Sequence, residues 1–233
     1  MDRHWHEVTS STNDEAQKLI QDGAPHGTLV GADYQQKGRG RSGNQWQCSP
    51  GQGLMCSLIL YPQWSRTYWG WIALGAALAL CEVLERDCLS PQIKWPNDIL
   101  IKGRKIAGVL TEVKDEAVIV GIGVNLNMKH VPTVASGLQP TSFLLETDCT
   151  LQPQAYARTI QSHLVQIMSA DSPLLLREQI TQRIAWLGEQ ITLQTKTEEM
   201  DGRIVGLGDY GQLLLEQGAQ TREVYDAFHI RKV

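Results

Sequence analysis

The sequence predicts an α+β fold, in which a largely antiparallel sheet flanked by helices is followed by a small β-barrel. Three observations lead to this prediction. Apolar strands in the middle of the chain follow one another across short turns, which favours antiparallel pairing. Alanine- and leucine-rich segments before and after these strands have the pattern of helices. The last segment contains only short strands and should depend on the larger domain for its stability. We therefore expect one domain over residues 1–186 and a small barrel over residues 187–233.

The residue pattern up to position 84 predicts two helices and two strands. Small polar residues at positions 10–13 precede two acidic residues and an amphipathic stretch, which is typical of a capped helix N-terminus. The second strand is apolar enough to be buried on both faces. In order, the expected elements are a helix over residues 14–20, strands over 28–34 and 54–60, and a helix over 69–84.

The remaining elements are placed by the same patterns. Central strands are expected over residues 92–95, 99–101, 105–113 and 117–124, and residues 126–150 are expected to form a loop. Two helices should follow over residues 152–169 and 173–186. The barrel strands are expected over residues 191–195, 203–207, 212–216 and 222–225.

Composition argues against several classes of protein. The chain has no apolar run long enough to span a membrane, and its N-terminus lacks the apolar segment of a secretory signal. The five cysteines are odd in number and form no Cys-x-x-Cys pair. This favours reduced thiols in the cytoplasm over a zinc site or a disulfide framework. A net charge of −4 is unusual for a domain that binds nucleic acid.

A polar loop over residues 35–45 is the most informative functional signal. It contains no apolar side chain, whereas 42% of the chain is hydrophobic. Glycine lets backbone N–H groups approach a ligand, and arginine presents a planar charged group that matches phosphate oxygens. The pattern predicts a phosphate- or nucleotide-binding loop that is mobile when empty, although a solvated basic turn or a nucleic-acid site is the alternative. The residues concerned are Gly38, Gly40 and Gly43, with Lys37, Arg39 and Arg41 between them.

Two further segments place polar residues beside predicted secondary structure. Residues 11–13 cap a helix, and their side chains can face the polar head group of a ligand at the same time. Lys94 lies on the strand before the turn over residues 96–98, and Lys105 opens the apolar strand that follows the next turn, over residues 102–104. An ordinary exposed hairpin has the same composition. However, a cation at the end of a core strand can point into a cleft and stabilise developing negative charge.

A third segment contains two glycines inside an apolar strand. Gly121 and Gly123 weaken the strand, and glycines at such positions mark a bulge or the close approach of another group. They form either a packing pair or a flat floor for a ring of a ligand, with Asn125 as a polar contact.

Five motifs occur in one order within residues 9–127. They are Ser-Thr-Asn at 11–13, Tyr-Gln-Gln-Lys-Gly-Arg-Gly-Arg-Ser-Gly-Asn-Gln-Trp at 34–46, Lys-Trp-Pro-Asn-Asp at 94–98, Arg-Lys-Ile-Ala-Gly-Val-Leu-Thr-Glu at 104–112 and Gly-Ile-Gly-Val-Asn-Leu-Asn at 121–127. Each motif alone is a weak signal, but the ordered set closely resembles the biotin–protein ligases, also called biotin–[acetyl-CoA-carboxylase] ligases.

The resemblance implies both a fold and an activity. It implies a mixed, largely antiparallel sheet flanked by helices and an SH3-like C-terminal barrel. It also implies an enzyme that uses ATP and Mg²⁺ to convert biotin into biotinyl-5′-AMP. Such an enzyme then transfers biotin to one lysine of a biotin carboxyl carrier protein or domain of acetyl-CoA carboxylase.

The same resemblance assigns roles to residues of this chain. Lys105, Arg39 and Arg41 are the expected catalytic residues. The expected biotin contacts are Ser11, Thr12, Asn13, Gln35, Arg39, Gly40, Arg41, Lys105, Gly108 and Gly121. The expected nucleotide contacts are Arg39, Arg41, Trp46, Lys94, Asn97, Asp98, Gly123 and Asn125. Mg²⁺ is expected to arrive with the phosphates of ATP, with Asp98 as a candidate ligand.

The chain departs from some relatives, and other functions remain open at this stage. The first motif begins at position 11, which predicts a monofunctional ligase without a DNA-binding domain. Ser42 replaces an arginine of some relatives, and residues 225–229 match the family only loosely. The alternatives are a lipoate or octanoyl ligase and a non-enzymatic anion-binding adaptor. A sheet edge that pairs with a second copy would give a homodimer, but a monomer is equally compatible with the sequence.

Overall fold

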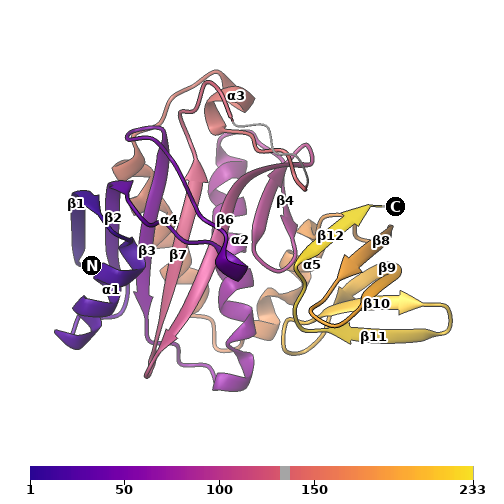
Figure 1. Cartoon of the computed structure of the whole chain (residues 1–233). Coiled ribbons are helices and arrows are strands. Elements are labelled where there is room, and N and C mark those ends of the chain that lie inside the picture. The colour runs from indigo at the N-terminus through magenta and orange to yellow at the C-terminus, as the bar shows by residue number, and fades with distance from the viewer. Residues whose placement is uncertain (132–136, 233) are drawn as a thin grey trace.

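The computed structural model describes residues 1–131 and 137–232, which form a seven-stranded sheet with helices and a smaller five-stranded sheet (Figure 1). The elements of the larger part are β1 (Arg3–Thr9), α1 (Thr12–Gln21), β2 (Thr28–Gln35), β3 (Gly53–Leu60), α2 (Gly70–Arg86), β4 (Pro91–Lys94), β5 (Asp98–Ile101), β6 (Arg104–Lys114), β7 (Ala117–Asn125), α3 (Phe143–Thr147), α4 (Pro153–Met168) and α5 (Arg177–Arg183).

The larger sheet is mixed and largely antiparallel, as predicted. Its strand order is β1-β2-β3-β7-β6-β5-β4. Strands β1 and β2 pair in parallel, and each of the other neighbouring pairs is antiparallel. Helix α1 connects the two parallel strands, since such a pair requires a crossover connection.

Helices cover both faces of this sheet because its central strands are apolar on both sides. Every residue of β3 is buried. Leu29 and Leu58 belong to the main core with α2 and α4, whereas their neighbours Val30 and Ile59 pack with α1. Successive residues of a strand point to opposite faces, so α1 lies on one side of the sheet and α2 and α4 on the other.

Several predicted elements differ in detail from the structure. Strand β1 was not among the expected strands, because it is an edge strand whose side chains are mostly exposed and polar. Part of the expected loop over residues 126–150 forms helix α3, and residues 132–136 lie outside the described residues. The helix expected over residues 173–186 is a 3-10 turn over Pro173–Leu176 followed by α5. Among the described residues, no helix has both the length and the apolar character needed to cross a membrane.

The C-terminal part is the expected small antiparallel β domain. Its strands are β8 (Gln190–Gln194), β9 (Glu199–Leu207), β10 (Leu213–Gln217), β11 (Gln220–Val224) and β12 (His229–Lys232), in the order β11-β10-β9-β8-β12. The sequence did not predict β12, which has only four residues and one buried side chain.

The two parts share one continuous hydrophobic core. This core extends from Trp71 of α2 to Leu207 and Leu213 of the C-terminal strands. Two indoles also reach across, since Trp71 Nε1 donates to Asp209 O at 2.8 Å and Trp95 Nε1 donates to Gly211 O at 2.9 Å. The small domain therefore depends on the larger one, as expected of a domain of this size. The boundary between residues 186 and 187 stays a prediction.

We predict that Trp71→Phe destabilises both parts of the protein together. The change removes the donor to Asp209 O. Because Trp71 is fully buried, the smaller phenyl ring also leaves a small cavity in its place. Together these losses should lower the free energy of unfolding by about 1–3 kcal/mol. Trp69→Phe is the matched control, because its indole donates to Trp64 O within the same segment. Denaturant unfolding measures both; equal stability of Trp71→Phe and wild type would contradict the prediction.

Candidate active site

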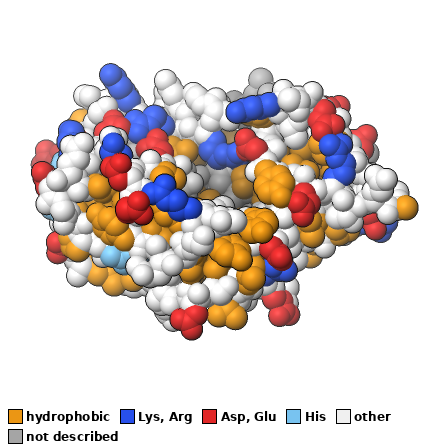
Figure 2. All heavy atoms as spheres, turned by 90° about the horizontal axis from the view of Figure 1, so that it is seen from below, with side chains coloured by type: hydrophobic (Ala, Val, Ile, Leu, Met, Phe, Trp, Pro, Cys, Tyr) orange, Lys and Arg blue, Asp and Glu red, His pale blue; other side chains and the backbone are white. Residues whose placement is uncertain are grey.

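A cavity of about 300 Å³ opens between the face of the large sheet that carries α1 and the C-terminal domain. Its walls come from the start of α1, the loop after β2, the β4–β5 turn, strands β6 and β7, and the segment between β11 and β12. In the space-filling view from below, this face is hollowed near its centre, and charged and hydrophobic side chains border the hollow (Figure 2). The cavity therefore gathers segments that are far apart in the sequence.

Almost every site residue expected from the sequence lines this one cavity. They are Ser11, Thr12, Asn13, Gln35, Arg39, Gly40, Arg41, Trp46, Lys94, Asn97, Asp98, Lys105, Gly108, Gly121 and Gly123. Asn125 is the exception. Its side chain is buried, and its amide donates to Thr141 O at 2.9 Å. The described structure therefore gives Asn125 a role in holding the chain at Thr141 rather than a place in the cavity wall.

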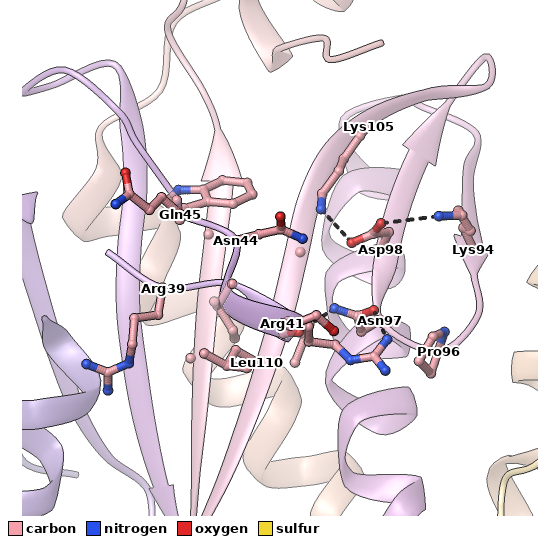
Figure 3. Close-up of a pocket in the computed structure, with 18 of the residues that line it drawn as sticks. Arg39, Arg41, Asn44, Gln45, Lys94, Pro96, Asn97, Asp98, Lys105 and Leu110 are labelled. Atoms are coloured by element: carbon pink, nitrogen blue, oxygen red, sulfur yellow. Dashed lines mark hydrogen bonds and ion pairs between the residues drawn. The ribbon is translucent and has the colours of Figure 1, made fainter. Parts of the chain in front are cut away.

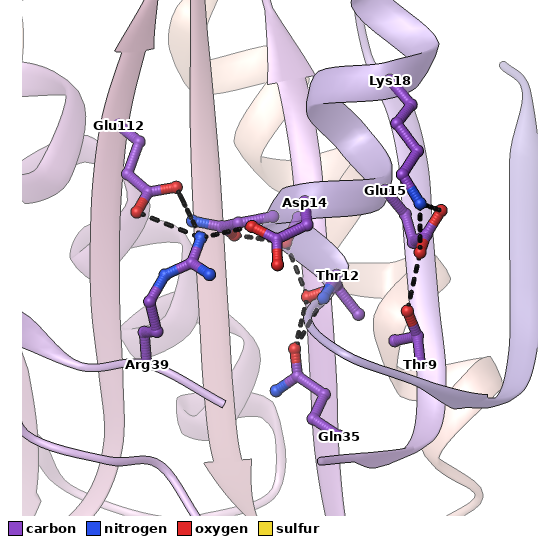
Figure 4. A network of polar contacts seen from close by, with 10 residues as sticks. Thr9, Thr12, Asp14, Glu15, Lys18, Gln35, Arg39 and Glu112 are labelled. Carbon is purple, nitrogen blue, oxygen red and sulfur yellow. Dashed lines mark hydrogen bonds and ion pairs between the residues drawn. The ribbon is translucent and has the colours of Figure 1, made fainter. Parts of the chain in front are cut away.

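A polar network forms the end of the cavity beside α1 (Figure 4). Gln35 Oε1 accepts from both Thr12 N at 2.7 Å and Thr12 Oγ1 at 3.1 Å. Ser57 Oγ lies 2.7 Å from Thr12 Oγ1 and 2.5 Å from Asn13 Oδ1, and Asn13 Nδ2 donates to Glu112 Oε2 at 2.8 Å. These partners fix the orientation of the amide and hydroxyl groups, which suits the recognition of a small polar ring.

Two members of this network were not among the residues predicted from sequence. Ser57 is a single polar residue in a fully buried strand, and that contrast was the available signal. Glu112 stands at the end of the fourth motif. Helix α1 begins at Thr12, two residues before the predicted start, so Ser11 alone is its N-cap residue, and the Ser11 side chain makes no capping hydrogen bond.

The floor of the cavity is made by glycines, which confirms the predicted close approach. A Cβ atom on Gly121 would lie 2.6 Å from Asn13 Oδ1, and one on Gly123 would lie 2.3 Å from the Trp46 ring. Any side chain at these positions would therefore displace the residue above it. Trp46 covers Gly123, and Lys105 Nζ lies 5.7 Å from the centre of its ring.

Two lysines and one carboxylate form the charged wall opposite the loop (Figure 3). Lys105 Nζ lies 2.6 Å from Asp98 Oδ1, and Lys94 Nζ lies 3.8 Å from Asp98 Oδ2. The side chains of Asp98 and Lys94 are each only 14% exposed. Burial lowers the pKa of Lys94 below the ordinary value of 10.5; Asp98 opposes this shift, and the nearby charges of Lys105 and Arg41 add to it. The wall therefore holds cations that are poorly solvated and that an incoming anion would stabilise.

The two arginines of the loop point in different directions (Figure 3). Arg39 points away from the lysines and pairs with Asp14 Oδ1 at 2.8 Å and Glu112 Oε2 at 3.3 Å. Arg41 NH1 donates to Asn97 Oδ1 at 3.1 Å, and its NH2 group pairs with Asp226 of the C-terminal domain. Both arginines are thus held by carboxylates. The predicted mobility of the empty loop stays a prediction.

The C-terminal domain contributes directly to the cavity, which the sequence did not reveal. Residues 227–230 line it, and Asp226 beside them pairs with Arg41. Asn44 and Gln45 of the loop line it as well. Residues 225–229 matched the family only loosely, so the available signal was their single acidic residue beside an apolar pair.

The described residues of this site favour neither a cysteine nucleophile nor a metal ion held by protein side chains. Cys56 lines the cavity, but burial raises the pKa of its thiol to about 12, so it is not a nucleophile at neutral pH. Among residues 1–131 and 137–232, no group of three or more His, Cys, Asp or Glu side chains could hold a metal ion. Both oxygens of Asp98 face lysines, so this carboxylate alone is a weak candidate for binding Mg²⁺.

Fold and cavity together define a protein with a cation-lined site suited to an anionic ligand, and comparison with known proteins identifies the family. Residues 5–128 match the Biotin/lipoate A/B protein ligase family, and residues 186–232 match the Biotin protein ligase C terminal domain. The chain belongs to the biotin/lipoate A/B protein ligase family.

Within this family, the chain is similar to several biotin ligases. A biotin--[acetyl-CoA-carboxylase] ligase of Paracoccus denitrificans is 34% identical over 237 residues, which cover 95% of this chain and 97% of the relative. The bifunctional ligase/repressor BirA of Bacillus subtilis is 32% identical over 243 residues, covering 96% of this chain and 72% of that protein. The solved biotin protein ligase from Aquifex aeolicus in complex with biotin and ATP superposes with a TM-score of 0.89 at 26% identity, covering 100% of this chain and 99% of that one.

If Arg41 binds the phosphates of ATP, as the sequence leads us to expect, Asp226→Asn should lower the KM for ATP by about twofold to fivefold, because the carboxylate would compete with phosphate and a half-exposed ion pair is worth only about 1 kcal/mol. Glu198→Gln is the control, since Glu198 pairs with Arg222 in the same domain at 2.8 Å. Steady-state kinetics with varied ATP measure the effect. An unchanged or raised KM in Asp226→Asn would contradict it.

We also predict that Lys94→Met makes the protein more stable and less active. Because the folded-state pKa of Lys94 is depressed, its charge costs folding free energy at neutral pH, and this cost disappears as pH rises through the folded-state pKa toward 10.5. The gain in unfolding free energy should therefore be larger at pH 7 than at pH 10, while the rate falls about tenfold. Denaturant unfolding curves of Lys94→Met and wild type at both pH values measure this gain. A gain in unfolding free energy that is larger at pH 10 than at pH 7 would contradict the prediction.

Proposed function

We propose that this protein activates biotin with ATP and transfers the biotinyl group to a lysine of a biotin carboxyl carrier protein. The observation that carries the proposal is the convergence of Lys94, Lys105 and Arg41 beside a floor of glycines in one cavity. The family assignment and the likeness to a biotin- and ATP-bound ligase support biotin and ATP as the substrates.

The first step joins two anions, and the cavity supplies the fixed cations that reduce their repulsion. The carboxylate oxygen of biotin attacks the α-phosphorus of ATP, a P–O bond breaks, and pyrophosphate leaves with biotinyl-5′-AMP as the product. Repulsion between carboxylate and triphosphate opposes their approach, so fixed cations lower the barrier. We assign this role to Lys105 and Arg41, with Lys94 and Asn97 orienting the phosphates. Mg²⁺ carried by the phosphates of ATP would add to this screening, with Asp98 as the residue expected from the sequence to be near it.

The rest of the cavity binds the two organic groups. The network of Thr12, Asn13 and Gln35 fits a ring with both donors and acceptors, such as the ureido ring of biotin. Because Gly121 and Gly123 have no side chains, Asn13 and Trp46 can pack directly on the strand and present an amide and an aromatic ring to the cavity. We assign Trp46 to cover the intermediate, because an acyl-adenylate hydrolyses in water and must be shielded.

The second step delivers biotin to the acceptor. The neutral amine of a carrier lysine attacks the acyl carbon, the bond to the phosphate oxygen breaks, and AMP leaves as the amine gives up a proton. This protein partner is proposed from the family assignment.

Other partners and the location are proposed on separate grounds. All five cysteines are free, which supports the cytoplasm. The net charge of −4 supports the absence of a DNA partner. Strand β1 forms an edge of the large sheet, with Val8 55% exposed, and supports a homodimer through edge pairing, which solution mass measurement would test.

The proposed function is tested by the mass of a carrier domain. After incubation with the protein, biotin and MgATP, the carrier should gain the mass of one biotinyl group, and lipoate in place of biotin should give none. Lys105→Ala should lower the rate by about a hundredfold or more while thermal unfolding stays near that of wild type, because the lysine side chain is a third exposed and packs little core. An unmodified carrier, or full activity in Lys105→Ala, would refute the proposal.

A further inference from the structure

The backbone of Lys105 is held differently from the rest of β6. The β5–β6 ladder shifts register between Ile99 and Leu100, and the ladder with β7 begins only at Ala107. At Lys105 a separate segment takes the place of β7: Lys105 N donates to Gln139 O at 2.9 Å, and Thr141 N donates to Lys105 O at 2.9 Å. A β-bulge beside a functional residue can set the direction in which its side chain points. Here the hydrogen bonds from residues 139–141 hold the irregular backbone at Lys105 in place.

A buried carboxylate fastens this segment to the sheet. Glu146 of α3 has a side chain that is only 1% exposed. Its Oε1 atom accepts from Thr141 Oγ1 at 2.6 Å and from Arg104 NH2 at 2.6 Å. Its Oε2 atom faces Lys102 Nζ at 3.2 Å, an ion pair without hydrogen-bond geometry. Burying a charge is costly unless it is paired, so these contacts should be strongly preferred.

The contacts of Glu146 lie on both sides of Lys105. Arg104 immediately precedes Lys105 in β6, and Thr141 pairs with the Lys105 carbonyl. Asn125 adds a second tie, because its amide donates to Thr141 O. One carboxylate thus links the strand that carries Lys105 with the segment that pairs with it, although Glu146 itself does not line the cavity.

We propose that Glu146 is a positioning residue for the adenylation step, acting through Lys105. The inference rests on the proposed function, in which Lys105 Nζ meets the biotin carboxylate and the α-phosphate. Lys105 Nζ stands 2.6 Å from Asp98 in the empty site, and its strand must hold it within reach of both reacting groups, because a displacement of about 1 Å at a reacting group can cost about a hundredfold in rate. Glu146 keeps the strand in this position through its contacts with Arg104 and Thr141.

The competing explanation is that Glu146 only anchors α3. Helix α3 has its own anchors, since Ser142 Oγ donates to Met128 O at 2.7 Å and accepts from Leu145 N at 3.2 Å. A residue that only anchored α3 would lower stability without a selective effect on the reaction step. A positioning residue would lower kcat while the biotin-binding network by Thr12 stays intact.

The test compares Glu146→Ala and Glu146→Gln with wild type and with the control Glu116→Ala. Glu116 pairs with Arg66 at 2.8 Å on an exposed surface. In adenylate formation with biotin and MgATP, Glu146→Ala should lower kcat by roughly tenfold to a hundredfold and change the KM for biotin by less than about threefold. Glu146→Gln keeps an acceptor for Thr141 and should show a smaller loss, but one that still exceeds about twofold because the charge that pairs with Arg104 and Lys102 is removed. The control should match wild type.

Amide hydrogen exchange provides the readout that a role in stability alone would not change. In Glu146→Ala the amides of Lys105 and Thr141 should exchange faster, while those of the β3–β7 ladder keep their protection. A folded Glu146→Ala or Glu146→Gln with kcat within about twofold of wild type would overturn the inference, as would faster exchange across the whole sheet. If Glu146→Ala does not fold, Glu146→Gln decides. Lack of adenylate formation by wild type would instead refute the proposed function, and a local rise in exchange would still show that Glu146 holds this segment.

Discussion

The site depends on Asp98, a nearly buried carboxylate that holds two lysines together at the end of the sheet. Without it, Lys94 and Lys105 would repel each other in a place where water screens poorly. The loop arginines follow the same pattern, since Arg39 pairs with Asp14 and Glu112 and Arg41 pairs with Asp226. Each of these four cations therefore faces a carboxylate of the protein, and a triphosphate can replace that partner at low cost in reorganisation.

The rest of the cavity follows from how these charges are supported. Lys94 and Lys105 stand on strands that are backed by the buried core, so their positions are set before any ligand arrives, whereas Arg39 and Arg41 stand on the loop after β2. Between them, Gly121 and Gly123 leave room for Asn13 and Trp46, which pack directly on the strand and form part of the cavity wall. The C-terminal domain closes the remaining side through Asp226 and its neighbours, which explains why the two parts share one core.

The sequence predicted the parts of this structure that local pattern determines. Glycines inside an apolar strand have few explanations, and a loop without apolar residues cannot be core; both therefore indicated the cavity correctly. Asn125 looked equivalent to its neighbours, but a long-range bond to Thr141 turns its amide away, and no local pattern reports such a bond. Strands β1 and β12 were missed because edge strands need little apolar surface. Asp226 and Glu146 act only through tertiary contacts.

The central claim is that this cavity joins the carboxyl group of biotin to the α-phosphate of ATP. The most direct measurement incubates the purified protein with biotin and MgATP, without a carrier, and detects the bound product by mass spectrometry after rapid denaturation. The account predicts biotinyl-5′-AMP in an amount close to that of the protein, together with released pyrophosphate. If biotin and ATP are both recovered unchanged from protein that is folded and binds them, the account is contradicted.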